Sequence, residues 1–444
     1  MHRTRLLGTA RPFLAALVAL LAITAGCSDT GDDSVSGGWL DGSPARADAD
    51  RGDEAGGAGA STASAADASG ARAESMSSAP VEPAAGLRAG SVDDNEDFAG
   101  YLAYRQRAST VGVTSRDLDV SVRHVVEVHG DDGRPVLGEP VEVVADGAVV
   151  ASVRTGTDGR AFVHPRAMGI GDGERVSLRV DGVQREPAQD GPTSFELDRT
   201  GGAAAPVPLD VFFLLDATGS MGDELDRLTA TVDSVVERIS ALDGEPDVRL
   251  GMTVYRDQGD PFVTRTFDFT DDAASFRSAL AEVHADGGGD YPEALDEALG
   301  AALEEPSWRP SGEAVQIVFV VADAPPQIER DVATPYDESL RLAATRGIRI
   351  HAVGASGSSD AAEYALRQFS QYTGGRFVFL SYGVGGAALG PSTDIASVDY
   401  EELPLEDLLV RLVAEQLADL TGNDVVLPPT SSTSTTEPQQ RQGG

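Results

Sequence analysis

Apolar residues recur with two different periods along the chain, and the change of period divides it. Between residues 120 and 197 they alternate with polar residues in short runs, for example at 120–128 and 141–145. Alternation of this kind is typical of half-buried strands, and Asp146-Gly147 between two runs is typical of a hairpin turn. The pattern predicts a short helix near 97–107 followed by a small all-β sandwich, together spanning residues 95–200.

From residue 207 onward, nearly continuous apolar segments alternate with segments of helical period. Residues 209–215 are apolar except for Asp210, as expected for a strand that is covered on both faces. Apolar residues then recur at steps of three and four, the spacing of one helix face, at Leu225, Leu228, Val232, Val235 and Ile239. Further strands are expected at 248–255, 315–321, 348–353 and 377–380, and a last helix at 405–420. The alternation predicts an α/β domain over 207–421 with a doubly wound, mostly parallel sheet.

Oxygen-bearing side chains lie where the predicted parallel strands end. Asp216, Thr218 and Ser220 follow the first strand, Asp323 follows the strand at 315–321, and Asp290 ends a glycine-rich loop. Ligands of doubly wound sheets collect beyond the carboxyl ends of the strands, so we expect these five residues to meet. Carboxylate and hydroxyl oxygens suit a hard divalent cation, and the sequence therefore predicts a metal site.

Several of these residues also have simpler interpretations. Ser220 stands where a helix begins and is a natural N-cap. Asp257 and Asp260 are interpreted as solvated turn residues beside the site. His351 lies inside a predicted strand and is interpreted as a core or edge histidine.

The order of these loops resembles a known family. Asp216-x-Thr218-x-Ser220, the string GGGDYPE at 287–293 and Asp323 after its apolar strand are similar to the von Willebrand factor A (vWA) domain, in particular its hemicentin-type branch and bacterial relatives. The resemblance implies a Rossmann-like vWA fold with a metal-ion-dependent adhesion site. It also implies that Thr218 and Ser220 bind the ion through their hydroxyls, and Asp216 and Asp323 through water.

The second loop departs from the family pattern, which has a threonine there. Gly289 occupies that place and Asp290 stands beside it, so Asp290 is the expected second-loop ligand. The resemblance implies Mg²⁺ as the cofactor, with Ca²⁺ or Mn²⁺ as alternatives because a directly bound Asp290 would add negative charge that favours Ca²⁺.

The N-terminal segment has the order of a secretory signal peptide. A basic start precedes an apolar run at 13–23, small residues follow, and Cys27 is the single cysteine of the chain. Residues 1–27 resemble a bacterial lipoprotein signal, which implies lipidation of Cys27 and export to the cell envelope, anchored to the outer face of a membrane. Thr24 stands where that pattern usually has leucine, so cleavage without lipidation is the alternative. Residues 28–94 and 422–444 are poor in large apolar side chains and are expected to be a disordered linker and a disordered tail.

Charge and resemblance together define the expected function. The net charge of −38 argues against nucleic acid as a partner, because phosphate backbones repel an acidic surface. The chain is expected to be a non-enzymatic binding protein that captures an Asp or Glu of a partner protein through the cation. An envelope assembly or scaffold factor is the alternative, and a serine hydrolase with Ser220 as nucleophile and His351 as base is a remote one. The β-sandwich loosely resembles immunoglobulin-like modules and is expected to be a spacer.

Overall fold

The computed structural model describes residues 87–429, apart from positions 117, 244, 290, 356, 382–388, 390–392 and 396–399. The predicted signal segment with Cys27, most of the predicted linker, Asp290 and the end of the predicted tail lie outside the described residues. Within the part described, every helix is too short or too polar to cross a membrane.

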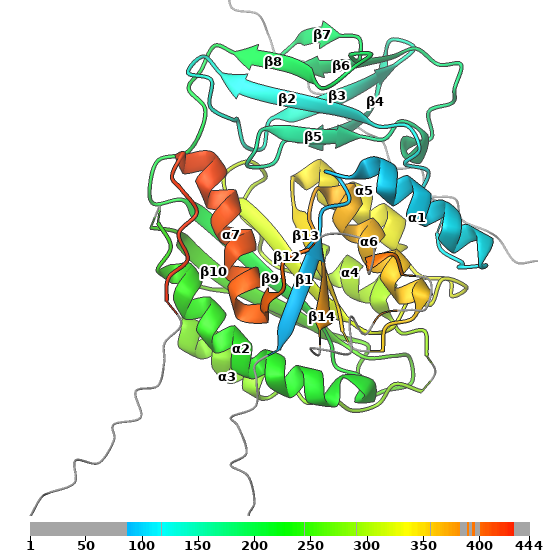
Figure 1. The fold of residues 1–444 in the computed structure, drawn as a ribbon, viewed down its shortest axis with the longest axis vertical. Helices are drawn as coiled ribbons and strands as arrows, with labels where there is room; N and C mark the ends of the chain where they lie inside the picture. Colours follow the sequence, from blue (N-terminus) through cyan, green and yellow to red (C-terminus); the bar gives the residue numbers. More distant parts are fainter. Residues whose placement is uncertain are drawn as a thin grey trace, which may run out of the picture. The chain divides into compact units, whose positions relative to one another are not determined.

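An eight-stranded mixed sheet forms the centre of the α/β domain (Figure 1). Neighbouring strands from β10 to β14 run parallel, whereas β11 and β1 pair antiparallel with their neighbours. In spatial order the strands are β11 (Thr264–Thr270), β10 (Asp247–Tyr255), β9 (Pro208–Asp216), β12 (Val315–Ala322), β13 (Arg349–Gly354), β14 (Phe377–Ser381), β1 (Arg88–Val92) and β15 (Leu403–Pro404). This is the α/β architecture that the alternating pattern predicted.

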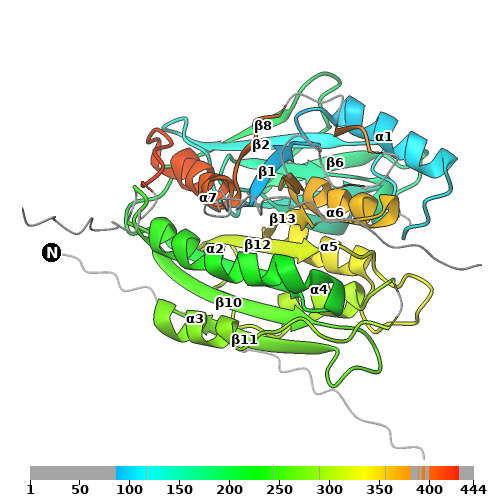
Figure 2. The same ribbon diagram turned by 60° about the horizontal axis from the view of Figure 1, so that its bottom comes forward.

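Helices cover both faces of this sheet (Figure 1). One layer consists of α2 (Gly222–Ser240), α3 (Ala273–Ala281) and α7 (Leu405–Thr421). The other consists of α1 (Phe98–Thr110), α4 (Leu295–Glu304), α5 (Tyr336–Arg346) and α6 (Asp360–Thr373). Figure 2 shows α3 beside β10 and β11, at one end of the sheet.

The side chains of β9 explain why both faces must be covered. Val211 and Phe213 pack in one hydrophobic cluster with α2 and α7, whereas Phe212 and Leu214 pack in a second cluster with α4 and α5. Successive strand residues point to opposite faces, so a continuous apolar run supplies both clusters. The strand is therefore buried along its length, and Asp216 at its end is held by a rigid element.

The N-terminal end of the described chain corrects two predictions. Arg88–Val92, placed in the disordered linker by the sequence, form β1 between β14 and β15. Helix α1, assigned by the sequence to the β-sandwich, packs through Tyr101 and Tyr104 in the same cluster as Phe369 of α6. Both segments therefore belong to the α/β domain, although the chain enters the β-sandwich after them.

Two smaller sheets follow α1 and share one hydrophobic cluster. The first contains β5 (Arg160–Val163), β2 (His124–Gly130) and β8 (Thr193–Leu197), with β2 and β8 parallel. The second contains β4 (Ala148–Arg154), β3 (Pro140–Ala145), β6 (Val176–Val180) and β7 (Val183–Arg185), all antiparallel. The resemblance of this part to an immunoglobulin-like module stays a prediction.

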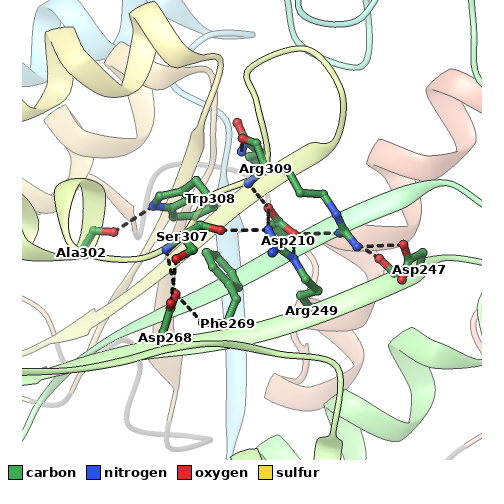
Figure 3. Close-up of polar contacts among 10 residues, drawn as sticks. Asp210, Asp247, Arg249, Asp268, Phe269, Ala302, Ser307, Trp308 and Arg309 are labelled. Carbon is green, nitrogen blue, oxygen red and sulfur yellow. Dashed lines mark hydrogen bonds and ion pairs between the residues drawn. The ribbon is translucent and has the colours of Figure 1, made fainter.

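The amino end of β9 carries a buried carboxylate in an ionic network (Figure 3). The Asp210 side chain is fully buried and accepts hydrogen bonds from the guanidinium groups of Arg249 and Arg309 at 2.8–2.9 Å. The backbone N–H of Arg309 donates to the same carboxylate at 3.0 Å. Charge-assisted contacts of this kind satisfy a buried carboxylate, so Asp210 fixes the loop before β12 to the edge of the sheet.

Candidate functional site

Asp216, the last residue of β9, lies at the centre of the candidate site and is fully buried. One of its carboxylate oxygens accepts hydrogen bonds from the Thr218 backbone N–H at 2.9 Å and the Thr218 hydroxyl at 2.7 Å. The other oxygen accepts a hydrogen bond from the Tyr255 hydroxyl at 3.0 Å. Tyr255 stands beside Asp216 in the register of β9 and β10, and sequence reasoning did not identify it.

The two predicted hydroxyl ligands lie next to Asp216 and face Asp323. The oxygens of Thr218 and Ser220 are 3.3 Å apart, and burial raises the pKa of Asp323 while a hydrogen bond from Ser220 opposes that rise. Helix α2 begins after Met221 with no side-chain cap, so the N-cap interpretation of Ser220 is wrong. Four of the five predicted residues, Asp216, Thr218, Ser220 and Asp323, are thus brought together, and Asp290 is not among the described residues.

Backbone hydrogen bonds hold two loops together around these side chains. The Gly219 N–H donates to the Gly287 carbonyl at 3.1 Å, and the Asp286 N–H donates to the Ala217 carbonyl at 3.0 Å. Gly287 and Gly288 both have positive φ values, 78° and 73°, a conformation that glycine adopts without steric cost. The glycine-rich loop is therefore fixed against the loop that carries Thr218 and Ser220.

Asp257 and Asp260 are structural residues of this scaffold; the prediction that Asp257 is solvated is wrong, whereas Asp260 is a partly exposed turn residue. Asp257 is 2% exposed and pairs with Arg330 at 3.0 Å. Asp260 accepts hydrogen bonds from the Gly288 N–H at 2.9 Å and the Asp257 N–H at 3.1 Å. The contact with Gly288 holds the glycine-rich loop in place, and Arg330 compensates the negative charge of Asp257.

Glu293 is a further acidic residue of the site, and sequence reasoning did not select it as a ligand. Its side chain is 4% exposed, and its Oε2 atom is buried without a hydrogen-bond partner. The Oδ1 atom of Asp323, which is 5% exposed, is in the same situation. Position 293 follows Pro292 at the end of the GGGDYPE string, which was the available sequence signal.

Burial and mutual repulsion shift the pKa values of these acids upward. Burial raises the pKa of Asp216 to about 7, against the opposing effect of the Thr218 hydrogen bonds. Burial, followed by the negative charges of Asp216 and Asp257, raises the pKa of Glu293 to about 8. Burial also raises the pKa of Asp323. A nearby cation would favour the ionised form of all three acids, so a proton or a cation must satisfy them.

The oxygen donors fit a hard divalent cation, which takes carboxylate and hydroxyl ligands. In the described part of the chain no three His, Cys, Asp or Glu side chains are grouped closely enough to hold an ion by themselves. The hydroxyls of Thr218 and Ser220 are therefore needed in the set. Buried, unpartnered oxygens on Asp323 and Glu293 are the observation that supports the fit, because orphaned buried acceptors are costly.

His351, the expected core histidine, is 1% exposed and lies in β13. Its ring stacks on Phe319, and its Nδ1 atom accepts a hydrogen bond from the Arg376 N–H at 3.0 Å. Burial lowers its pKa to about 3. The core interpretation is confirmed, and these contacts do not place His351 beside Ser220.

Comparison with known proteins identifies this domain. Residues 210–382 match the von Willebrand factor type A domain, and the chain therefore contains a vWA domain. von Willebrand factor A domain-containing protein 7 of Rattus norvegicus is 35% identical over 116 residues, which cover 26% of this chain and 12% of that protein. The alpha-protein kinase vwkA of Dictyostelium discoideum is 28% identical over 119 residues, which cover 26% of this chain and 18% of that protein.

These matches span less than a fifth of the relatives' own length. Among solved structures, proximal thread matrix protein 1 from the mussel byssus aligns at 15% identity and a TM-score of 0.30. The alignment covers 48% of this chain and 46% of the mussel chain. A score this low supports no further argument.

Proposed function

We propose that this chain is a non-enzymatic binding protein whose vWA domain captures a partner protein through a divalent cation. Asp216, Thr218, Ser220 and Asp323 would hold the ion, with Asp290 as the second-loop ligand. Mg²⁺ is the first choice of ion, with Ca²⁺ and Mn²⁺ as alternatives. The vWA match supports a role in protein interaction.

One observation carries this proposal. Among the described residues, every hydrogen bond to Asp216 comes from a neutral group, namely Thr218 or Tyr255. A fully buried carboxylate without a positive partner is unstable unless its charge is compensated. Within the described residues no arginine contacts this carboxylate, so its charge is removed by a proton or compensated by a cation from solution, and the cation leaves it ionised.

Each residue of the site would have a different role in holding the ion. The hydroxyls of Thr218 and Ser220 offer neutral oxygen ligands, while Asp216 and Asp323 supply charge and orient bound water. Tyr255 fixes the rotamer of Asp216 by its hydrogen bond, and the glycine-rich loop closes one side. A bound divalent cation would supply an open coordination position for an Asp or Glu of the partner.

The remaining parts of the proposal concern the location of the protein. Export, lipidation of Cys27 and attachment to the outer face of a membrane in a bacterial cell envelope would place the vWA domain at the end of a long linker. The same domain could serve an envelope assembly or scaffold factor instead. A complex that co-purifies with the protein from its native envelope favours assembly, whereas binding only to an added ligand favours adhesion.

The serine hydrolase alternative finds no support. It needs a base beside Ser220, and the described contacts of His351 are with Phe319 and Arg376. The kinase activity in the name of the Dictyostelium protein belongs to that protein, of which the match covers 18%.

Metal analysis and partner capture with the full chain test the proposal. After dialysis against Mg²⁺ or Ca²⁺, the wild-type protein should retain one ion per chain and Asp216→Asn none. Partner proteins should bind the immobilised wild type in Mg²⁺ and elute with EDTA, and Ser220→Ala should not capture them. Ser278→Ala, at an exposed position of α3, is the matched control. Capture that persists in EDTA, or equal ion content in Asp216→Asn, contradicts the proposal.

A further inference from the structure

We propose that Glu293 sets the affinity of the vWA site for its divalent cation by supplying a negative charge that the neutral hydroxyl ligands lack. The inference rests on the proposed cation site and adds to it a residue outside the D-x-T-x-S motif. Three features of Glu293 carry it: a fixed backbone, a buried carboxylate that faces the site, and a carboxylate oxygen without a hydrogen-bond partner among the described residues.

The backbone of Glu293 is tied to the loop that follows β12 and contains Asp323. Its N–H donates to the Pro325 carbonyl at 3.0 Å, and its carbonyl accepts from the Gln327 N–H at 3.1 Å. An isolated β-bridge joins Glu293 to Pro326. These contacts hold the residue at the edge of the site before helix α4 begins.

The carboxylate of Glu293 faces Thr218 across Gly288. A Cβ atom built on Gly288 would lie 2.8 Å from the Oε1 atom of Glu293 and 3.0 Å from the Cβ atom of Thr218. The two side chains are therefore separated by little more than the space that a methyl group would fill. Because Glu293 is only 4% exposed, its carboxylate points into the site and away from solvent.

Asp257 and Asp260 have partners among the described residues, whereas one carboxylate oxygen of Glu293 has none. Asp257 pairs with Arg330, and Asp260 accepts two backbone N–H groups. The Oε2 atom of Glu293 is buried without a hydrogen-bond partner in the described structure. A buried charge without a partner is costly, whereas the same charge beside a cation site raises affinity, since ligand charge tunes cation binding.

Glu293 therefore acts on the ion by its charge, and not as one of three grouped carboxylate ligands, since no such group exists among the described residues. The role resembles that of residues around metal ligands in general, whose loss costs about 10–100-fold in metal affinity. Thr218 and Ser220 are neutral, so among the described ligands only Asp216 and Asp323 would otherwise supply charge.

Terbium luminescence with the full chain tests this role. Tyr255, hydrogen-bonded to Asp216, is placed to sensitise bound Tb³⁺, and Ca²⁺ and Mg²⁺ affinities follow from displacement. Glu293→Gln should weaken both ions by about tenfold or more, and Glu293→Asp, which keeps the charge, should restore most of the affinity. Asp286→Asn, which removes an acid that is 81% exposed in the same loop, should leave the affinities within about threefold of the wild type.

The outcomes separate this inference from the proposed function. If Glu293→Gln binds ions like the wild type while Asp216→Asn does not bind them, the role of Glu293 is wrong and the cation site stands. If Asp216→Asn also binds like the wild type, the cation site itself is wrong. Thermal unfolding in EDTA provides a second readout: Glu293→Gln should be at least as stable as the wild type, and a lower melting temperature would show a merely structural role.

Discussion

Strand β9 has a buried aspartate near each end, and the two differ in the charge of the groups that contact them. Asp210 and Asp216 are both fully buried. Asp210 is contacted by Arg249 and Arg309 (Figure 3), whereas the described residues that donate hydrogen bonds to Asp216 are Thr218 and Tyr255. The negative charge of the same residue type is therefore compensated at one end of the strand and not at the other. We call the end with Asp210 the compensated end and the end with Asp216 the open end.

The difference separates a structural carboxylate from a binding one. An ion pair with good geometry completes the electrostatics of Asp210 within the chain, so that edge of the sheet has no need of a ligand. Neutral donors leave the negative charge of Asp216 uncompensated. Asp323 and Glu293 each add a buried oxygen without a hydrogen-bond partner among the described residues. A buried charge that the chain does not compensate indicates where a ligand binds.

The largest effect is expected at the compensated end. Asp210→Asn would leave two guanidinium groups beside an amide, and breaking a buried ion pair costs about 3–5 kcal/mol of unfolding free energy. Asp216→Asn is the matched control on the same strand, and in EDTA it should cost far less, because no positive charge is left behind. Urea denaturation of both variants measures the difference. Equal losses would remove the distinction between the two ends.

A smaller, pH-dependent effect is expected at the open end. In the metal-free protein the pKa of Asp216 is raised to about 7 from 3.8, so the folded state keeps a proton that the unfolded state loses. Its contribution to stability is complete below pH 3.8 and is lost as the pH rises through 7. Between pH 5 and 7 the unfolding free energy of the wild type should fall by about 2–3 kcal/mol relative to Asp216→Asn.

Denaturation at the two pH values in EDTA measures this difference between the two proteins. Saturating Ca²⁺ or Mg²⁺ should suppress it, because the cation favours the ionised carboxylate. A difference that stays constant with pH would mean that Asp216 is already ionised without metal, and the contrast with Asp210 would then lie in geometry alone.

The α/β core could be predicted from the sequence because its strands and helices carry strong apolar periods. Strand β1 could not, since its position depends on a close approach and not on hydrophobicity. Gly90 packs against the rings of Phe379 and Tyr400, where a Cβ atom would collide with both. A segment that is selected for small size resembles a linker in composition, and the sequence therefore placed it in the linker.

The site was predictable to the extent that chain order determines it. Asp216, Thr218, Ser220 and Asp323 follow strands that end at one edge, so topology alone brings them together. The role of Asp257 depends on Arg330, a partner 73 residues away, and the burial of Glu293 depends on contacts with Pro325 and Gln327. Neither long-range contact leaves a local pattern.

The smallest effect is expected for Tyr291, which joins the open end to helix α6 by neutral hydrogen bonds. Tyr291 is 47% exposed, while its hydroxyl donates to the Asp323 carbonyl at 3.1 Å and accepts from the Ser359 N–H at 3.0 Å. Tyr291→Phe should cost about 1 kcal/mol, the usual net contribution of a neutral hydrogen bond. Hydrogen exchange should quicken in the first turn of α6, where Ser359 is the N-cap.

Tyr400→Phe is the matched control, because that ring is 36% exposed and packs on Phe379 through its apolar part. It should change neither the unfolding free energy nor the exchange at α6 by a measurable amount. If Tyr291→Phe loses nearly as much unfolding free energy as Asp210→Asn, neutral contacts at the open end contribute as much stability as the ion pairs at the compensated end. The contrast between the two ends of β9 would then concern only charge and not the strength with which each end is held.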